Sequence, residues 1–424
     1  MSHFRFILIF LLIVIFVPAY TNAYTLKELI SLANKNYPVL QEQKLITSAE
    51  KERYKASFDP YYPTLDFSLG YTNYLQSRLN RELDDKNFYS GSLSLGYTLF
   101  NEKRAPAKEI KKYTFMIQEN IYKGIEKDLA KTIKDLYFKI LSEKKILESR
   151  LDTLSSAKRS LDLATAKRDV GLAKLSEVYQ ANVRYENAKL NIIETQNTIK
   201  KLLYELSSLI DRDINENDIE GELKTASIPL SQENLENIAL ERREEIIREK
   251  LALKSLEEEK KLAKSEFYPT AQTYLTYRRS DGSFVPPPSK EETRLDVVFN
   301  WNIFSGLGKF YNLKASDFDV SAQNKKIEEV IRKIRLEVKK VLADFDTATE
   351  QIKASDALLK SAKQNFEQAF EEYRIGKGDI LSLIQAEIDF ANAKENNIIA
   401  ILNQNLAKNL LERVLGIISF EELK

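Results

Sequence analysis

The residues that could carry out chemistry in this sequence are few, and their types limit what is possible. There is no cysteine, and the single histidine is His3. Thiol catalysis, disulfides, zinc sites of cysteine and histidine, and a histidine general base are therefore excluded, because His3 lies in a segment that we expect to be removed. Serines and carboxylates remain, but they form no G-x-S-x-G elbow, phosphate-binding loop or metal-ligand cluster. We predict no enzyme activity, no catalytic residues, no cofactor and no metal site.

The most informative polar residues flank two glycines that interrupt long helical patterns. Gly171 and Gly376 each follow a long helix, and glycine permits the left-handed conformation that ends one. Glu177 and Asp379 follow these glycines, and Tyr373 precedes Gly376. We expect all five residues to lie at the tips of two helical hairpins, where the chain turns back on itself.

The helices that position these tips are predicted to be very long. Isoleucine and leucine recur close to multiples of 3.6 residues after Ile121 and again after Ile327. No proline occurs over residues 107–228, and a helix over 107–169 would reach about 90 Å at about 1.5 Å per residue. A compact domain cannot bury such a helix along its whole length, so it needs helical neighbours from the same chain or from other copies.

Short segments with period-two alternation precede each long helix. They predict strands over about residues 64–75, 90–100, 270–279 and 294–304. Three of them place leucine and aromatic residues on one face and polar residues on the other, while the strand over 270–279 alternates more weakly. Such segments suit a transmembrane barrel, while the alternative is a soluble antiparallel sheet with one wet face. Four strands cannot close a barrel, and an open sheet edge is not tolerated in lipid. If the strands span a membrane, several copies must pool them.

The chain is a tandem repeat with an offset of roughly 205 residues. Tyr62-Pro63-Thr64 matches Tyr268-Pro269-Thr270, and the tip glycines match as well. We predict a first repeat over 24–210, a polar linker over 211–230 and a second repeat over 231–424. Each repeat reads helix, two strands, long helix, tip and return helix.

The first 23 residues are predicted to be a cleaved secretory signal. Phe6 to Val17 are all apolar, and Thr21-Asn22-Ala23 supplies small residues before a cut. A membrane anchor is the alternative, but about 20 apolar residues are needed to span a bilayer. The formal net charge of +1 gives no reason to expect nucleic acid as a partner.

Taken together, these residues resemble the TolC-like outer membrane efflux protein family over nearly the whole mature chain. The resemblance rests on the tandem repeat, on the segment from Leu32 to Leu40, and on Tyr373-Arg374-Ile375-Gly376 with Leu383, Gln385 and Ala386 downstream. It implies an α+β membrane protein. Long α-helical hairpins would form a periplasmic α-barrel, and each subunit would give four strands to a shared transmembrane β-barrel.

The resemblance also implies a function and partners. The chain would be the outer-membrane exit duct of a tripartite efflux or type I secretion system, with most of its mass in the periplasm. It would form a homotrimer in outer-membrane lipid and work with a periplasmic adaptor and an inner-membrane pump. Tyr373 matches a tyrosine that helps hold the tips closed, so the five tip residues become gate candidates.

The resemblance is incomplete at the tip. Relatives carry aspartates where this chain has Ser382 and Gln385. Asp379 and Glu177 are the nearest carboxylates that could form an acidic constriction, or they are solvated tip residues. For the whole chain, the alternative function is a soluble periplasmic coiled-coil scaffold.

Overall fold

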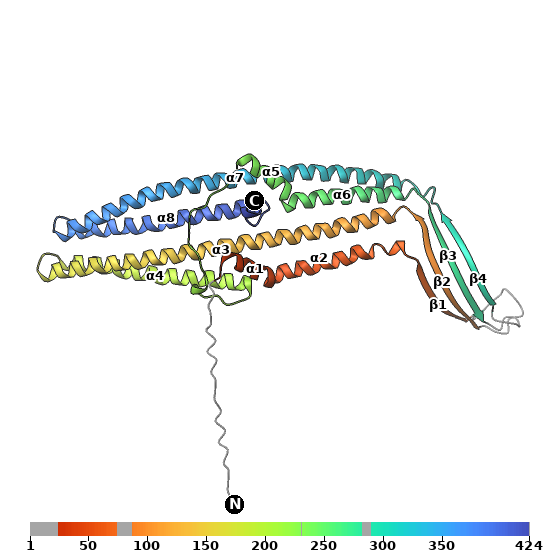
Figure 1. Cartoon of the computed structure of the whole chain (residues 1–424), viewed down its shortest axis with the longest axis horizontal. Coiled ribbons are helices and arrows are strands. Elements are labelled where there is room, and N and C mark those ends of the chain that lie inside the picture. The colour runs from red at the N-terminus through yellow and green to blue at the C-terminus, as the bar shows by residue number, and fades with distance from the viewer. Residues whose placement is uncertain (1–23, 74–86, 230, 282–289, 424) are drawn as a thin grey trace, which may run out of the picture.

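A computed structural model describes residues 24–73, 87–229, 231–281 and 290–423. The molecule is a long rod in which helices run side by side, with a sheet at one end and two helical turns at the other (Figure 1). The proposed signal and the tips of both strand hairpins lie outside the described residues. No helix in the described ranges is long and apolar enough to cross a membrane.

Both repeats contain the same succession of elements, and each long helix spans most of the rod (Figure 1). The first repeat comprises α1 Leu26–Asn36, α2 Pro38–Ala56, β1 Thr64–Asn73, β2 Asn87–Asn101, α3 Arg104–Asp169 and α4 Leu175–Ile210. The second comprises α5 Gln232–Arg242, α6 Glu244–Ser265, β3 Thr270–Asp281, β4 Lys290–Asn300, α7 Gly308–Arg374 and α8 Ile380–Val414. At about 1.5 Å per residue, the 66 residues of α3 extend roughly 100 Å.

The helices form a single curved layer rather than a closed bundle. Helices α2 and α4 lie end to end along one side of α3, while α6 and α8 lie end to end between α3 and α7 (Figure 1). One side of α7 and the outer sides of α2 and α4 therefore form the two edges of the layer. The short helices α1 and α5 contact α4 and α7, but no long helix of the described residues covers either outer edge.

The sheet follows the order of the helical layer. Its four antiparallel strands pair in the order β1-β2-β3-β4. The register places Leu65 opposite Leu95, Leu95 opposite Leu275, and Leu275 opposite Leu295. Side chains alternate across a strand, so this row marks one apolar face running across the whole sheet.

The strand boundaries differ most from the prediction in β4. The alternation predicts a strand over 294–304, whereas β4 spans Lys290–Asn300. Asn300 pairs with Thr270, the first residue of β3, so residues 301–304 have no neighbouring strand to pair with. Apolar residues continue the alternation there, but alternation alone does not supply a hydrogen-bonding partner.

Each repeat has its own apolar core in the middle of the rod. The first contains Leu29, Ile133, Leu206 and Ile219, and it draws only on residues before the second repeat. The second contains Leu235, Val338, Leu411 and Phe420. Part of the predicted linker thus enters a core: Ile219 is buried and forms an isolated bridge with Tyr24. Apolar residues of both repeats meet in a third cluster at the tips.

Candidate functional site: an exposed apolar sheet and two packed helical tips

The apolar face of the sheet is exposed along its length. In β1, Leu65, Phe67 and Leu69 have exposed fractions of 68%, 69% and 77%. In β4, Leu295 and Phe299 reach 68% and 62%. A soluble sheet would bury its apolar face against a second layer, but no described element covers this one. The arrangement instead matches strands whose apolar side chains face hydrocarbon.

The opposite face of the sheet is polar and internally hydrogen bonded. The hydroxyls of Ser68 and Ser92 lie 2.8 Å apart, and those of Ser94 and Thr276 lie 3.0 Å apart. Arg294 donates to Asp296 at 2.8 Å. This face can line a water-filled passage, because its groups can exchange hydrogen bonds with solvent.

The two turns form where the glycine pattern predicts. Helix α3 ends at Asp169 and Gly171 has φ of +78°; α7 ends at Arg374 and Gly376 has φ of +80°. A side chain at either glycine would meet no other atom within 4 Å, so conformation rather than space favours glycine here. The amide of Gly171 donates to the carbonyl of Arg168, and that of Gly376 to the carbonyl of Tyr373.

Tyr373 lies at the centre of the cluster that joins the two tips. Its side chain is 2% exposed and packs with Ala164, Ala181, Ile380 and Leu383. Its hydroxyl donates to Oε2 of Glu177, on α4, at 3.3 Å. Burial, followed by the negative charge of Glu177, raises the pKa of Tyr373 to about 12. The phenol thus remains a hydrogen-bond donor over the physiological range.

Sequence reasoning missed one residue of this contact, Lys167 near the end of α3. Its ammonium nitrogen lies 4.4 Å from the centroid of the Tyr373 ring. The same group donates to the backbone carbonyl of Tyr373. Lys167 therefore binds the tyrosine through both its ring and its backbone, by a cation–π contact and a hydrogen bond. Lysine is common on helices, so no pattern in the sequence distinguishes this one.

The two tip carboxylates are used to cap helices. Oε1 of Glu177 accepts from the backbone amide of Lys174 at 3.1 Å, at the start of α4. Oδ1 of Asp379 accepts from the amides of Leu381 and Ser382 at 2.9 and 3.0 Å, and these bonds lower the pKa of Asp379. Both carboxylates thus accept hydrogen bonds that stabilise the turns at the starts of α4 and α8. Glu177 also joins the two tips, whereas Asp379 caps only its own helix.

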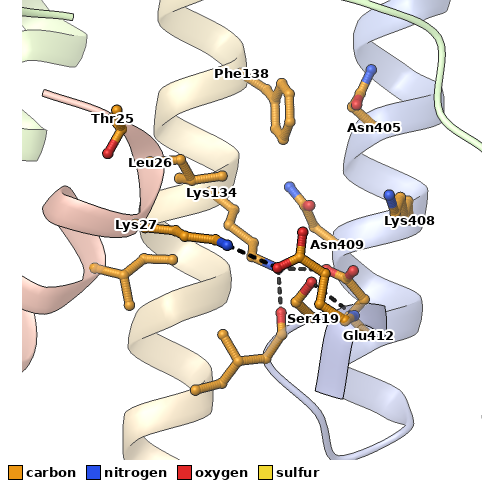
Figure 2. Close-up of a pocket in the computed structure, with 13 residues that line it drawn as sticks. Thr25, Leu26, Lys27, Lys134, Phe138, Asn405, Lys408, Asn409, Glu412 and Ser419 are labelled. Carbon is orange, nitrogen blue, oxygen red and sulfur yellow. Dashed lines mark hydrogen bonds and ion pairs between the residues drawn. The ribbon is translucent and has the colours of Figure 1, made fainter. Parts of the chain in front are cut away.

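One cavity in the middle of the rod lies where α1 meets the segment after α8. It has a volume of about 560 Å³, and its walls come from α1, α3, α8 and the segment after α8 (Figure 2). Lys134 crosses its floor to Oε2 of Glu412 at 2.5 Å and donates to the carbonyl of Ile418 (Figure 2). Lys27 and Glu421 form an ion pair of 2.9 Å at its rim. These contacts tie the end of the chain to both repeats.

The described residues contain no group of three or more histidine, cysteine, aspartate or glutamate side chains placed to hold a metal ion. What they do contain is a strand set with one exposed apolar face, joined to long helical hairpins whose tips pack together. This combination defines an outer-membrane channel subunit with most of its mass in the periplasm.

Comparison with known proteins identifies the family. Residues 29–211 and 235–417 each match the outer membrane efflux protein model, so the chain belongs to that family and the tandem repeat is a family feature. The chain is 19% identical to outer membrane protein TolC of Escherichia coli, over 95% of this chain and 84% of that protein. It is 22% identical to a probable efflux pump outer membrane protein, TtgC of Pseudomonas putida, over 72% and 63% of the two chains.

Solved structures share the fold. The outer membrane protein VceC of Vibrio cholerae superposes with a TM-score of 0.80 at 14% identity, over 92% of this chain and 96% of that one. Membership in this family confirms the predicted fold class and location. The chain is an outer-membrane exit duct for efflux or type I secretion.

Proposed function

We propose that three copies of this chain form a channel that passively conducts cargo out of the cell. A periplasmic adaptor and an inner-membrane pump would deliver the cargo and supply the energy. The observation that carries the proposal is the exposed apolar row across β1 to β4, which needs hydrocarbon around it. Within the described residues, β1 and β4 each pair with one strand only, so further copies must complete the sheet.

The edges of the helical layer support assembly from several copies. Helix α4 exposes Tyr179, Ile193 and Tyr204 by 63%, 61% and 71%, and α7 exposes Phe318 and Leu358 by 65% and 51%. These residues lie on the outermost helices of the layer, where the α7 edge of one copy can pack against the α2/α4 edge of the next. Three copies would pool twelve strands, an even number compatible with a closed barrel.

The assembly is testable by fractionation and mass measurement. A channel remains with the outer membrane, migrates as a heat-modifiable oligomer and has the mass of three chains in detergent. A soluble scaffold, the alternative function, would leave with the periplasm and stay dispersed without detergent. A monodisperse monomer in detergent-free buffer would overturn the proposal.

We further propose that the tips form the gate and that Tyr373 holds it closed. Its hydroxyl joins α7 to Glu177 of the other hairpin, and its ring binds Lys167. Opening would be a shift between two packings of the tips, biased by partner binding. Each tip residue would then have its own role. Gly171 and Gly376 form the turns, and Glu177 joins the two tips. Tyr373 is the latch, and Asp379 caps α8.

Planar-bilayer recordings test the latch. Tyr373→Phe removes only the hydroxyl bond to a charged acceptor, a contact worth about 1.5–3 kcal/mol, and should raise the single-channel conductance. Tyr373→Ala also removes the buried ring and should raise it further. Tyr62→Phe is the matched control, because that tyrosine is 65% exposed and lies just before β1, at the opposite end of the rod from the tips. Conductance unchanged in both Tyr373 variants would show that the residue is not a latch.

A further inference from the structure

Away from the tip cluster, the contact between the first hairpin and α8 is made by polar links, most of them ion pairs. Above the tip cluster, polar links recur along one face of α8 at 387, 394–395, 409 and 412–413. They are Arg184–Glu387, Lys394–Asp152, Arg150–Glu395, Asn409–Asp135, Lys134–Glu412 and Arg413–Asp128. The apolar cores of the two repeats stay on their own sides of this contact. We call it the hairpin seam.

A seam of ion pairs fixes one alignment of the helices. Apolar contacts would allow one helix to shift slightly along another, since hydrophobic contact is not directional. The guanidinium of Arg150 instead binds both carboxylate oxygens of Glu395, at 2.8 and 3.0 Å, and also donates to the hydroxyl of Thr195 at 2.8 Å. Such a fork matches its partner in one geometry only. Sliding α8 along α3 would break the fork and leave charges in a half-buried position.

The part of the seam near the tips is the less completely bonded. Arg184 donates to Oε1 of Glu387 at 3.2 Å, and Ser160 lies 3.4 Å from the other oxygen. Nη2 of Arg184 is buried without a hydrogen-bond acceptor among the described residues. Beside it, a polar cavity of about 140 Å³ reaches Arg150 and is wide enough for water. Because the buried guanidinium of Arg184 lacks one hydrogen bond and lies beside a cavity, we expect the hairpin seam to separate first at this pair.

The end of the hairpin seam away from the tips is more completely hydrogen bonded. Lys134 bonds to Glu412 and to the carbonyl of Ile418, and the second oxygen of Glu412 accepts from the amide of Phe420 at 3.2 Å. The side chains of Lys134 and Glu412 are 8% and 4% exposed. Unlike Nη2 of Arg184, no atom of these two side chains is buried without a hydrogen-bond partner among the described residues, although the cavity of about 560 Å³ adjoins them. We therefore expect this end to stay fixed.

From this difference we infer that Arg184 and Glu387 are positioning residues for the gate. They set the alignment of α8 that places Tyr373 against Glu177, and their pair must separate when the tips open, while Lys134–Glu412 remains as the pivot. Glu387 lies seven residues into α8 from Ile380, or about 10 Å along the helix. The inference rests on the proposed gating function and names the regulation of that same site.

A charge exchange tests the inference with the whole assembly in planar bilayers. Glu387→Arg faces Arg184 with a like charge and should raise the open probability by about tenfold or more, because an unpaired buried charge is strongly destabilising. The double variant Arg184→Glu with Glu387→Arg restores the pair and should return the open probability towards that of the native channel. This rescue is the readout that a merely structural role would not produce.

Matched variants separate this inference from the proposed function. Arg243→Glu breaks ion pairs with Glu245 and Glu337, outside the hairpin seam, and should lower the melting temperature of the assembly but leave the open probability unchanged. If Glu387→Arg does not assemble, Glu387→Gln keeps the shape and should act in the same direction with a smaller effect. Normal gating in every Glu387 variant, together with raised conductance in Tyr373→Ala, would overturn the positioning role and leave the latch intact. Absence of any channel in the native protein would instead overturn the proposed function.

Discussion

At the scale of single residues, the proposed latch, Tyr373, should not respond to ordinary changes of pH. The pKa of Tyr373 is raised from its usual value near 10 to about 12, first by burial and then by Glu177. A raised pKa means that the stability contributed by the neutral phenol is fully present below about pH 10. It is lost only as the pH rises through about 12.

This sign gives a prediction for conductance. The difference in single-channel conductance between the native channel and Tyr373→Phe should be constant from about pH 6 to about pH 9, because the hydroxyl remains protonated throughout. Recordings of both proteins in one buffer series check it. A difference that disappears within this interval would mean that a group other than the tyrosine hydroxyl controls the latch.

The residues of the tip were predictable from sequence only in part. Gly171 and Gly376 interrupt helical periodicity, and a φ near +80° at both explains why. The resemblance supplied Tyr373. Lys167, Arg184 and Glu387 could not be found in this way, because charges on a long helix usually face water. Their partners lie roughly 200 residues away in the chain, and only the packing of the two repeats brings them together.

At the scale of elements, removing one partner of the buried pair Lys134–Glu412, between α3 and α8, should destabilise the assembly. Replacing both partners with apolar residues should destabilise it much less. Removing one partner of such a pair costs about 3–5 kcal/mol, whereas apolar residues in place of both are often neutral or stabilising. Lys134→Met or Glu412→Leu alone should lower the melting temperature of the detergent-solubilised assembly, and the double variant should recover most of the loss.

Limited proteolysis provides a second measurement for the same pair. Lys134 also bonds to Ile418, and Glu412 to the amide of Phe420, so either single variant should expose the segment over 417–423 to cleavage. Arg332→Met serves as a control on α7, since its ion pair with Glu329 is exposed and such pairs contribute little. Equal loss of stability in single and double variants would contradict the argument.

The helices and strands were largely predictable from the periodicity of apolar residues. Helix α3 ends at Asp169 and the chain turns at Gly171, where glycine and apolar spacing provide local signals. The end of β4 was not predictable, since it depends on where β3 begins to pair. Strand ends are set by the neighbouring strand, and single-sequence patterns contain no information about that neighbour.

At the scale of the whole molecule, a single chain leaves sheet edges unpaired and apolar surfaces exposed. Among the residues that the structure describes, the sheet has two open edges, the helical layer exposes apolar residues at both edges, and the apolar face of the strands has no covering layer. All three deficits are removed together if copies pack edge to edge around an axis and the strands enter a bilayer. The sequence alone pointed to this solution, because four strands cannot close.

The orientation of the strands gives the last prediction. Leu95 lies in the row formed with Leu65, Leu275 and Leu295, on the face that we place against hydrocarbon. Arginine on such a face costs about 2–4 kcal/mol at the bilayer midplane and less near the interfaces. Leu95→Arg should therefore reduce the amount of heat-modifiable oligomer in outer-membrane fractions. The neighbouring Ser94→Arg points to the polar face and should assemble normally while altering ion selectivity. If Ser94→Arg disrupts assembly and Leu95→Arg does not, the sheet faces the opposite way.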